Sequence, residues 1–367
     1  MTITDITPAA PAAPAAPTGP PPPAVALQLA SGFIASQAVY VFTKLRIADA
    51  LAGGPRPADA IAARVGGEPD QVRRLTDALR ETVQRDDAPI LIDQEGGRVA
   101  RLKAPHWRHP PAAELFGRIH AQDPAASIQA ARLNAAVIGA ELLDLGLTVD
   151  CLPLIDLRFD GAHDIIGDRA FSDDPEIVAT LGRAAADGLI DAGVLPVIKH
   201  IPGHGRAVVD THEALPTVDT SLEDLRATDF RPFKALSDLP IAMTAHIVYQ
   251  SIDPLFPATT SPTLIEDVIR REMGFDGLLL SDDLSMKALQ GGLQERARDA
   301  VAAGCDIALH CNGDMTEMRD VAAGAPALSD SGVVRLEQAL SRVSGGGSGD
   351  AGDRLAELDD LIFKTIG

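Results

Sequence analysis

Hydrophobic positions after residue 88 fall into short apolar runs that end in polar or charged residues, separated by stretches rich in alanine and leucine. Short continuous apolar runs are typical of strands buried on both faces of a parallel sheet, with crossover helices between them. Six such runs stand out, with 214–218 as a weaker candidate strand: 89–94, 147–153, 195–200, 241–246, 277–283 and 305–312.

Nearly every run carries its polar residues at its C-terminal end, namely Asp93, Lys199, His200, His246, Asp282 and His310. A closed (β/α)8 barrel places its functional groups at that rim. An open doubly wound sheet does so only around a switch point. Polar ends on five or six strands therefore favour the α/β class and a TIM-type (β/α)8 barrel.

The first part of the chain has a different pattern. Residues 24–84 show helical periodicity and no strand signal, with a break at 53–57 and a short helix that begins at Pro69 and Asp70. Residues 1–23 form a Pro/Ala tract that cannot build a packed core, so we expect a disordered tail. Near the other end, 345–353 is predicted to be a flexible joint before a closing helix over 355–366.

Composition narrows the class of protein. The 367 residues include 32 Lys and Arg against 52 Asp and Glu, a net charge of −20 that argues against binding nucleic acid or anionic membranes. No apolar run is long enough to span a bilayer, and residues 1–23 lack the pattern of a secretory signal. The three cysteines, Cys151, Cys305 and Cys311, have no ligand-like spacing. These features predict a cytoplasmic protein with reduced thiols.

The segment 199–216 is dense in ionisable side chains on a loop punctuated by glycine and proline. One interpretation is a metal site made by His200, His204, Asp210 and His212, but ligands on an irregular loop make a weaker metal motif than ligands on a helix. The favoured interpretation is an Asp-x-His dyad. In it the Asp210 carboxylate holds the His212 imidazole and favours its charged form, which keeps a proton available for a leaving group.

The segment 268–286 places two carboxylates directly after a buried strand. Adjacent side chains on a strand point in opposite directions, so only one of them can face the barrel mouth. Asp283 is suited to cap a helix predicted over 284–289, which leaves Asp282 as the candidate nucleophile. A pair of acids that both cap or bind a cation is the alternative. Earlier in the chain, 91–102 supplies a carboxylate and arginines suited to gripping hydroxyl groups.

From about residue 76 to the end, the sequence resembles family 3 glycoside hydrolases, specifically the single-domain bacterial β-N-acetylglucosaminidases (β-hexosaminidases) of peptidoglycan recycling. The family signature is matched by Val268, Ile269, Arg270, Glu272, Gly277 to Leu280 and Ser281 to Ser285. Five further blocks occur in the family's order: DQEGGRVAR (93–101), IGDRAF (166–171), KHIPGHG (199–205), DTHEALP (210–216) and MTAHIVY (243–249).

The resemblance implies a role for each of several residues. Asp282 would be the nucleophile that forms a covalent glycosyl-enzyme, and His212, held by Asp210, would be the acid/base. Asp93, Arg101, Arg169, Lys199 and His200 would bind the sugar. The family needs no cofactor and no metal, and its substrate is a carbohydrate.

Residues 24–75 instead resemble the helical dimerisation region of small-molecule O-methyltransferases, although no glycine-rich cofactor loop follows. The first βα unit of the glycosidase barrel is not recognisable, so the predicted barrel has at best seven strands. The N-terminal helices could plug the gap, a partner chain could fill it, or the fold could be compromised, since an unfilled position leaves two exposed edges. Homodimerisation through these helices is a further expectation.

The sequence thus predicts three segments: the tail 1–23, the dimerisation-like segment 24–75 and the barrel 76–367. The predicted activity is that of a retaining, exo-acting β-N-acetylglucosaminidase acting on muropeptides or chitooligosaccharides. Two alternatives stay open at this point. They are an inactive truncated barrel that binds sugar or a partner, and a β-glucosidase of the same family.

Overall fold

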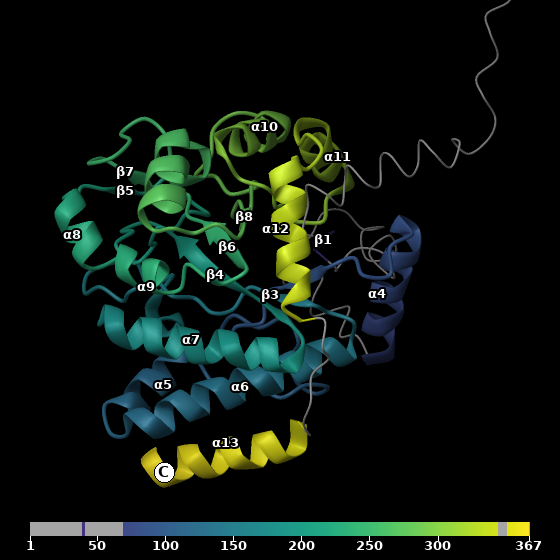
Figure 1. The fold of residues 1–367 in the computed structure, drawn as a ribbon, viewed down its shortest axis with the longest axis vertical. Coiled ribbons are helices and arrows are strands. Elements are labelled where there is room, and N and C mark those ends of the chain that lie inside the picture. Colours follow the sequence, from purple (N-terminus) through teal and green to yellow (C-terminus); the bar gives the residue numbers. More distant parts are fainter. Residues whose placement is uncertain (1–38, 41–68, 344–350, 367) are drawn as a thin grey trace, which may run out of the picture.

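The computed structural model describes residues 39–40, 69–343 and 351–366 (Figure 1). Its centre is a curled parallel sheet of six strands in the order β1-β2-β3-β4-β6-β8. The strands are β1 (Val39–Tyr40), β2 (Ile90–Ile92), β3 (Val149–Asp150), β4 (Leu195–Ile201), β6 (Ile241–Thr244) and β8 (Leu278–Leu280). A parallel bridge from Leu280 to Ile307 continues this order beyond β8. The α/β barrel class is confirmed.

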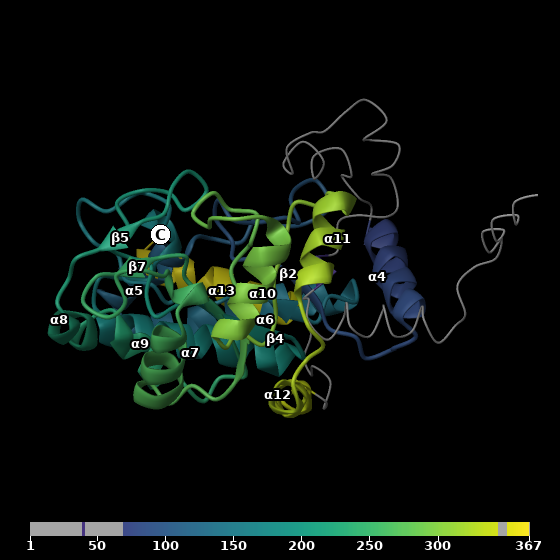
Figure 2. The same ribbon diagram turned by 90° about the horizontal axis from the view of Figure 1, so that it is seen from above.

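Helices follow the strands and cover the outer face of the sheet. The longer ones are α4 (Pro69–Val83), α5 (Ala113–His120), α6 (Pro124–Asp144), α7 (Pro175–Ala192), the π-type η3 (Thr263–Glu272), α10 (Leu293–Ala303), α11 (Met315–Gly324), α12 (Asp330–Ser341) and α13 (Ala351–Ile366). The short ones are η1 (Gly167–Arg169), α8 (Leu222–Ala227), α9 (Phe230–Ala235) and η2 (Ala258–Thr260). Figure 1 shows α7, α6 and α13 stacked on one side of the sheet, and in Figures 1 and 2 α4 and α8 lie at opposite ends of the molecule.

Two hydrophobic clusters explain why the strand sequences are apolar without alternation. In β2, Ile90 and Ile92 pack outward against the helices, whereas Leu91 packs inward with the interior side chains of the other strands. Each strand is thus buried on both faces, as expected for a parallel sheet under helices. The predicted helix starting at Pro69 and the closing helix are confirmed, the latter beginning at Ala351 inside the predicted joint.

Three expectations for the barrel segment, 76–367, were wrong. Thr217–Val218 (β5) pairs with Val248–Tyr249 (β7) in a separate two-stranded sheet, so 214–218 adds no strand to the main sheet. The run 305–312 contributes one bridge, at Ile307, and no continuous strand. Residues 284–289 form turns, and the next helix, α10, begins at Leu293, because the Asp283 carboxylate accepts the Ser285 N–H in a tight turn.

Two described residues of the N-terminal segment depart from the predicted helix. The backbone of Val39–Tyr40 forms β1, parallel to β2, with Val39 opposite Ile90 and Tyr40 opposite Leu91. This places two residues of the dimerisation-like segment at the edge of β2, where the missing first strand would leave backbone groups unpaired. A β-branched and aromatic run favours strand pairing once such an edge is available. The predicted tail and the remaining helices of residues 1–68 lie outside the described residues.

Within the described ranges, no helix combines the length and apolar character needed to cross a bilayer.

Helices α6 and α7 approach closely at two glycines, Gly139 and Gly188. A Cβ built on Gly188 would lie 2.2 Å from the carbonyl oxygen of Arg132, and one on Gly139 would lie 2.6 Å from the Cβ of Ala192. Backbone atoms cannot move aside as the end of a flexible side chain can, so the helix spacing depends on Gly188.

We predict that Gly188→Ala lowers the free energy of unfolding by about 1–3 kcal/mol, because overpacking outweighs the gain in helix propensity. Thermal unfolding of the purified chain checks this. Gly292→Ala is the control for a methyl group added in open space, since a Cβ there meets nothing within 4 Å; Gly292 is the N-cap of α10, so we expect only the loss of about 0.5 kcal/mol that alanine causes at a cap. Equal melting temperatures for the two variants would contradict the prediction.

Candidate active site

A cavity of about 210 Å³ opens at the C-terminal ends of the strands. The structure brings seven of the eight predicted site residues into its lining: Asp93, Arg101, Arg169, Lys199, His200, His212 and Asp282. The eighth, Asp210, is not part of the lining, but its Oδ1 lies 2.8 Å from the Nδ1 of His212. Four of these residues lie at or just after the C-terminal ends of β2, β4 and β8, and the other four come from η1 and the loops above the sheet. Parallel strands bring these ends together, which explains how residues far apart in sequence converge.

A buried charge network forms one side of the cavity. The Lys199 ammonium lies 2.7 Å from the Asp93 carboxylate and forms a second ion pair with Glu95. The Arg169 guanidinium donates two hydrogen bonds to Glu95, at 2.8 and 2.7 Å, and Arg101 donates to Asp93 at 2.7 Å. Glu95 was not among the predicted site residues, although it lies in the quoted block 93–101.

These contacts keep the buried groups ionised. Burial alone raises the pKa of Asp93, but the charges of Lys199, Arg101 and Arg169 outweigh it and hold that pKa well below its usual range. Burial lowers the pKa of Lys199, and Asp93 and Glu95 more than restore it, so the pKa of Lys199 lies above its usual value. The cavity wall therefore presents fixed cations and anions that can bind hydroxyl groups with charge-assisted hydrogen bonds.

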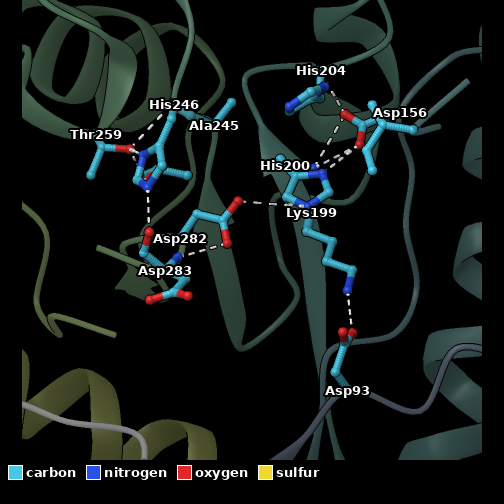
Figure 3. A network of polar contacts seen from close by, with 12 residues as sticks. Asp93, Asp156, Lys199, His200, His204, Ala245, His246, Thr259, Asp282 and Asp283 are labelled. Atoms are coloured by element: carbon cyan, nitrogen blue, oxygen red, sulfur yellow. Dashed lines mark hydrogen bonds and ion pairs between the residues drawn. The ribbon is translucent and has the colours of Figure 1, made fainter. Parts of the chain in front are cut away.

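Asp282 follows β8 and projects between two buried histidines (Figure 3). Its Oδ2 lies 3.9 Å from His200 Nε2, and its Oδ1 accepts the backbone N–H of Asp283 at 2.7 Å. Burial raises the pKa of Asp282, but His200, His246 and the hydrogen bond from Asp283 bring it below the usual value. Asp282 is thus a buried carboxylate in its anionic form, as a nucleophile requires.

Each histidine beside Asp282 has a buried partner that the sequence did not reveal. The Nδ1 of His200 lies 2.7 Å from the carboxylate of Asp156, which follows another apolar run, 152–155. The Nδ1 of His246 lies 2.7 Å from Thr259 Oγ1, and its Nε2 lies 3.0 Å from the carbonyl oxygen of Asp283. An acid at the end of an apolar run was the available signal for Asp156, whereas nothing local in the sequence marks Thr259.

His212 and Asp210 form the expected dyad on the irregular segment after β4. The Oδ1 of Asp210 lies 2.8 Å from His212 Nδ1 and also accepts the His212 backbone N–H. Burial raises the pKa of Asp210, but the hydrogen bonds from His212 lower it overall. The Ala288 N–H donates to the Thr211 carbonyl oxygen, which ties this loop to the turn after Asp282.

The alternative metal set is divided in the structure. His200 and the backbone of His204 share the Asp156 carboxylate, whereas His212 pairs with Asp210. In the part of the chain that the structure describes, no three His, Cys, Asp or Glu side chains are grouped as metal ligands would be. The geometry therefore favours the dyad over the four-residue metal site.

Comparison with known proteins shows to which family the chain belongs. Residues 61–344 match the model of the glycosyl hydrolase family 3 N terminal domain, and residues 27–84 match the O-methyltransferase dimerisation domain. The two matches overlap, so our predicted boundary near residue 75 stays a prediction.

Curated relatives include the beta-hexosaminidase of Alkalilimnicola ehrlichii, 41% identical over 262 residues that cover 68% of this chain and 74% of the relative. The beta-hexosaminidase of Bordetella avium is 34% identical over 296 residues, covering 80% of this chain and 81% of the relative.

Among solved structures, NagZ from Neisseria gonorrhoeae in complex with N-trifluoroacetyl-D-glucosamine matches with a TM-score of 0.71 and 30% identity, covering 81% of this chain and 87% of that one. A glycoside hydrolase family 3 beta-N-acetylglucosaminidase from Paenibacillus sp. str. FPU-7 matches with a TM-score of 0.74 and 28% identity, covering 92% and 68%. The barrel, the converging site residues and these matches together show that the chain belongs to glycosyl hydrolase family 3.

Proposed function

We propose that this chain is a retaining, exo-acting β-N-acetylglucosaminidase that removes terminal β-linked N-acetylhexosamine from peptidoglycan-derived muropeptides or chitooligosaccharides. The observation that carries the proposal is the anionic Asp282, held in one small cavity with His212 and the charge network around Lys199. The names of the relatives, beta-hexosaminidase and beta-N-acetylglucosaminidase, support the same activity.

In the proposed first step, an Asp282 carboxylate oxygen attacks the anomeric carbon of the sugar. The bond to the leaving oxygen breaks, and that oxygen takes a proton from the His212 imidazolium, so an alcohol leaves and a glycosyl ester forms. In the second step His212 takes a proton from water. The resulting hydroxide oxygen bonds to the anomeric carbon and Asp282 is released. Two displacements retain the configuration.

His212 suits this role for an electrostatic reason. A neutral imidazole places no second anion beside Asp282, whereas a carboxylate acid/base would repel the nucleophile after losing its proton. The Asp210 carboxylate holds Nδ1, which leaves Nε2 as the atom that gives and takes the proton.

The sugar itself would be held by the charge network. Asp93 can accept hydrogen bonds from sugar hydroxyls, while Lys199, Arg101 and Arg169 donate. The cavity volume of about 210 Å³ lies below the usual range for ligand pockets, about 300–1,000 Å³. A cavity of this size supports the binding of a single sugar residue, in keeping with the proposed exo action.

The net charge of −20 supports a substrate other than nucleic acid. A cytoplasmic location and homodimerisation through the N-terminal segment are part of the same proposal, the latter supported by the match of residues 27–84 to a dimerisation domain.

We predict that the purified chain releases nitrophenol from an aryl β-N-acetylglucosaminide and that Asp282→Asn lowers kcat by at least about 1,000-fold, the scale of losing an essential catalytic group. The amide cannot form the glycosyl ester. Asp276→Asn is the matched control, because that carboxylate is 88% exposed and lies just before β8 at the opposite end of the strand. Near-parental activity in Asp282→Asn would show that another residue is the nucleophile. A folded but inactive parent would favour a sugar-binding protein.

We predict that His212→Ala slows substrates with poor alkyl leaving groups by about 100-fold or more, and activated aryl ones far less, because protonation matters least for a good leaving group. The ratio of kcat/KM on the two substrates measures this. Val208→Ala, a 63% exposed position on the same loop, serves as the control. If kcat/KM fell equally on both substrates, His212 would not be the general acid.

A further inference from the structure

Two buried imidazoles lie on either side of Asp282, and the proposed mechanism uses neither of their partners (Figure 3). His200 presents Nε2 to the Asp282 carboxylate at 3.9 Å. His246 binds the backbone carbonyl of the next residue, Asp283. The proton positions on the two rings follow from what each partner can accept.

Asp156 contacts the Nδ1 side of the His200 ring. Its side chain is completely buried, and it accepts hydrogen bonds from His200 Nδ1 at 2.7 Å, from the His200 backbone N–H at 3.2 Å and from the His204 backbone N–H at 2.6 Å. Burial raises the pKa of Asp156, but these contacts bring it below its usual value, so the group is a carboxylate. A carboxylate only accepts hydrogen bonds, so Nδ1 of His200 carries a proton.

His246 is held in the opposite tautomer. The Asp283 carbonyl oxygen can only accept, so Nε2 of His246 carries the proton. Burial lowers the pKa of His246 and so favours the neutral ring. Its Nδ1 lies 2.7 Å from Thr259 Oγ1, whose hydroxyl also donates to the Ala245 carbonyl oxygen at 3.1 Å. His246 therefore fixes the backbone after the nucleophile, whereas the free Nε2 of His200 faces the nucleophile itself.

We propose that Asp156 is a positioning residue, which locks His200 in the Nδ1–H tautomer and aims Nε2 at Asp282 and at the sugar bound beside it. This inference rests on the proposed function for its catalytic consequence but not for its geometry. Backing carboxylates of this kind set both the ring orientation and the basicity of the far nitrogen.

The groups that face His200 are consistent with this assignment. They are Asp156, His204, Asp282 and His246, with Lys199 adjacent in the chain. Burial and the neighbouring His200 lower the pKa of His204 to about 4, so His204 is neutral near pH 7 and adds no competing charge. The Nδ1 of His200 lies within hydrogen-bond distance of Asp156, at 2.7 Å, whereas its Nε2 lies 3.9 Å from Asp282, beyond that distance.

The first test is ¹⁵N NMR of the imidazole rings in the full-length chain, with the His200 signals identified by their loss in His200→Gln. We expect a protonated Nδ1 on His200 in the parent and a mixed or Nε2–H population in Asp156→Asn, because the amide can donate as well as accept. An Nε2–H tautomer in the parent would overturn the inference, even if Asp156→Asn does not fold. An unchanged His200 spectrum in a folded Asp156→Asn variant would overturn it as well.

The second test is the pH profile of kcat/KM. We expect Asp156→Asn to lower kcat/KM by about 10–100-fold, the usual cost of losing such a backing group. His200 is the first of the groups that lower the pKa of Asp282, and Asp156 holds its ring in place for this contact. Without it the pKa of Asp282 rises, and since activity needs the carboxylate, the acid limb moves to higher pH. If the acid limb of Asp156→Asn lay at the same pH as that of the parent, Asp156 would have only a structural role.

Asp306→Asn is the matched control. Asp306 is another buried carboxylate, bound by Arg270 and Arg335 near the N-terminal end of β8, away from the cavity. We expect it to lower the melting temperature while the His200 spectrum and the acid limb stay unchanged. A parent with the expected tautomer but no glycosidase activity would overturn the proposed function alone, whereas an active parent with Nε2–H on His200 would overturn this inference alone.

Discussion

The architecture of the site depends on the neutralisation of charges that are taken out of water. Lys199 has a side chain only 3% exposed, and such an ion is tolerated only when opposite charges and hydrogen bonds replace its hydration. Asp93 and Glu95 supply those charges, and Arg169 and Arg101 balance the two carboxylates in turn. These residues come from three separate strand ends and loops, so the network forms only when β2 and β4 are in place.

The sequence was sufficient for the features that depend on local pattern. Continuous apolar runs identified the buried strands, and the polar residue after each run identified the rim, because parallel strands bring their C-terminal ends together. The same logic placed Asp282, Lys199 and His200 around one cavity. It could also have found Asp156, whose run ends in the same way.

Features that depend on contacts between residues far apart in the sequence could not be predicted from local sequence patterns. Thr259 becomes part of the site only because η2 packs beside His246. The run 214–218 has strand character but pairs with β7, since the choice of partner is a tertiary property. Val39–Tyr40 lies within a helical period, yet its backbone pairs with β2, where an edge is available. Local propensity is a weak prior against such pairing.

The contrast in exposure between the two proposed catalytic side chains has a consequence for proton supply. The His212 side chain is 60% exposed, whereas that of Asp282 is 10% exposed. In the proposed second step His212 regains its proton from the attacking water, and the exposure of its side chain lets that water come directly from bulk solvent. Buffer species can reach the imidazole as well. In the proposed reaction, proton transfer therefore takes place near the surface, at His212, whereas the covalent bond forms at the buried Asp282 carboxylate.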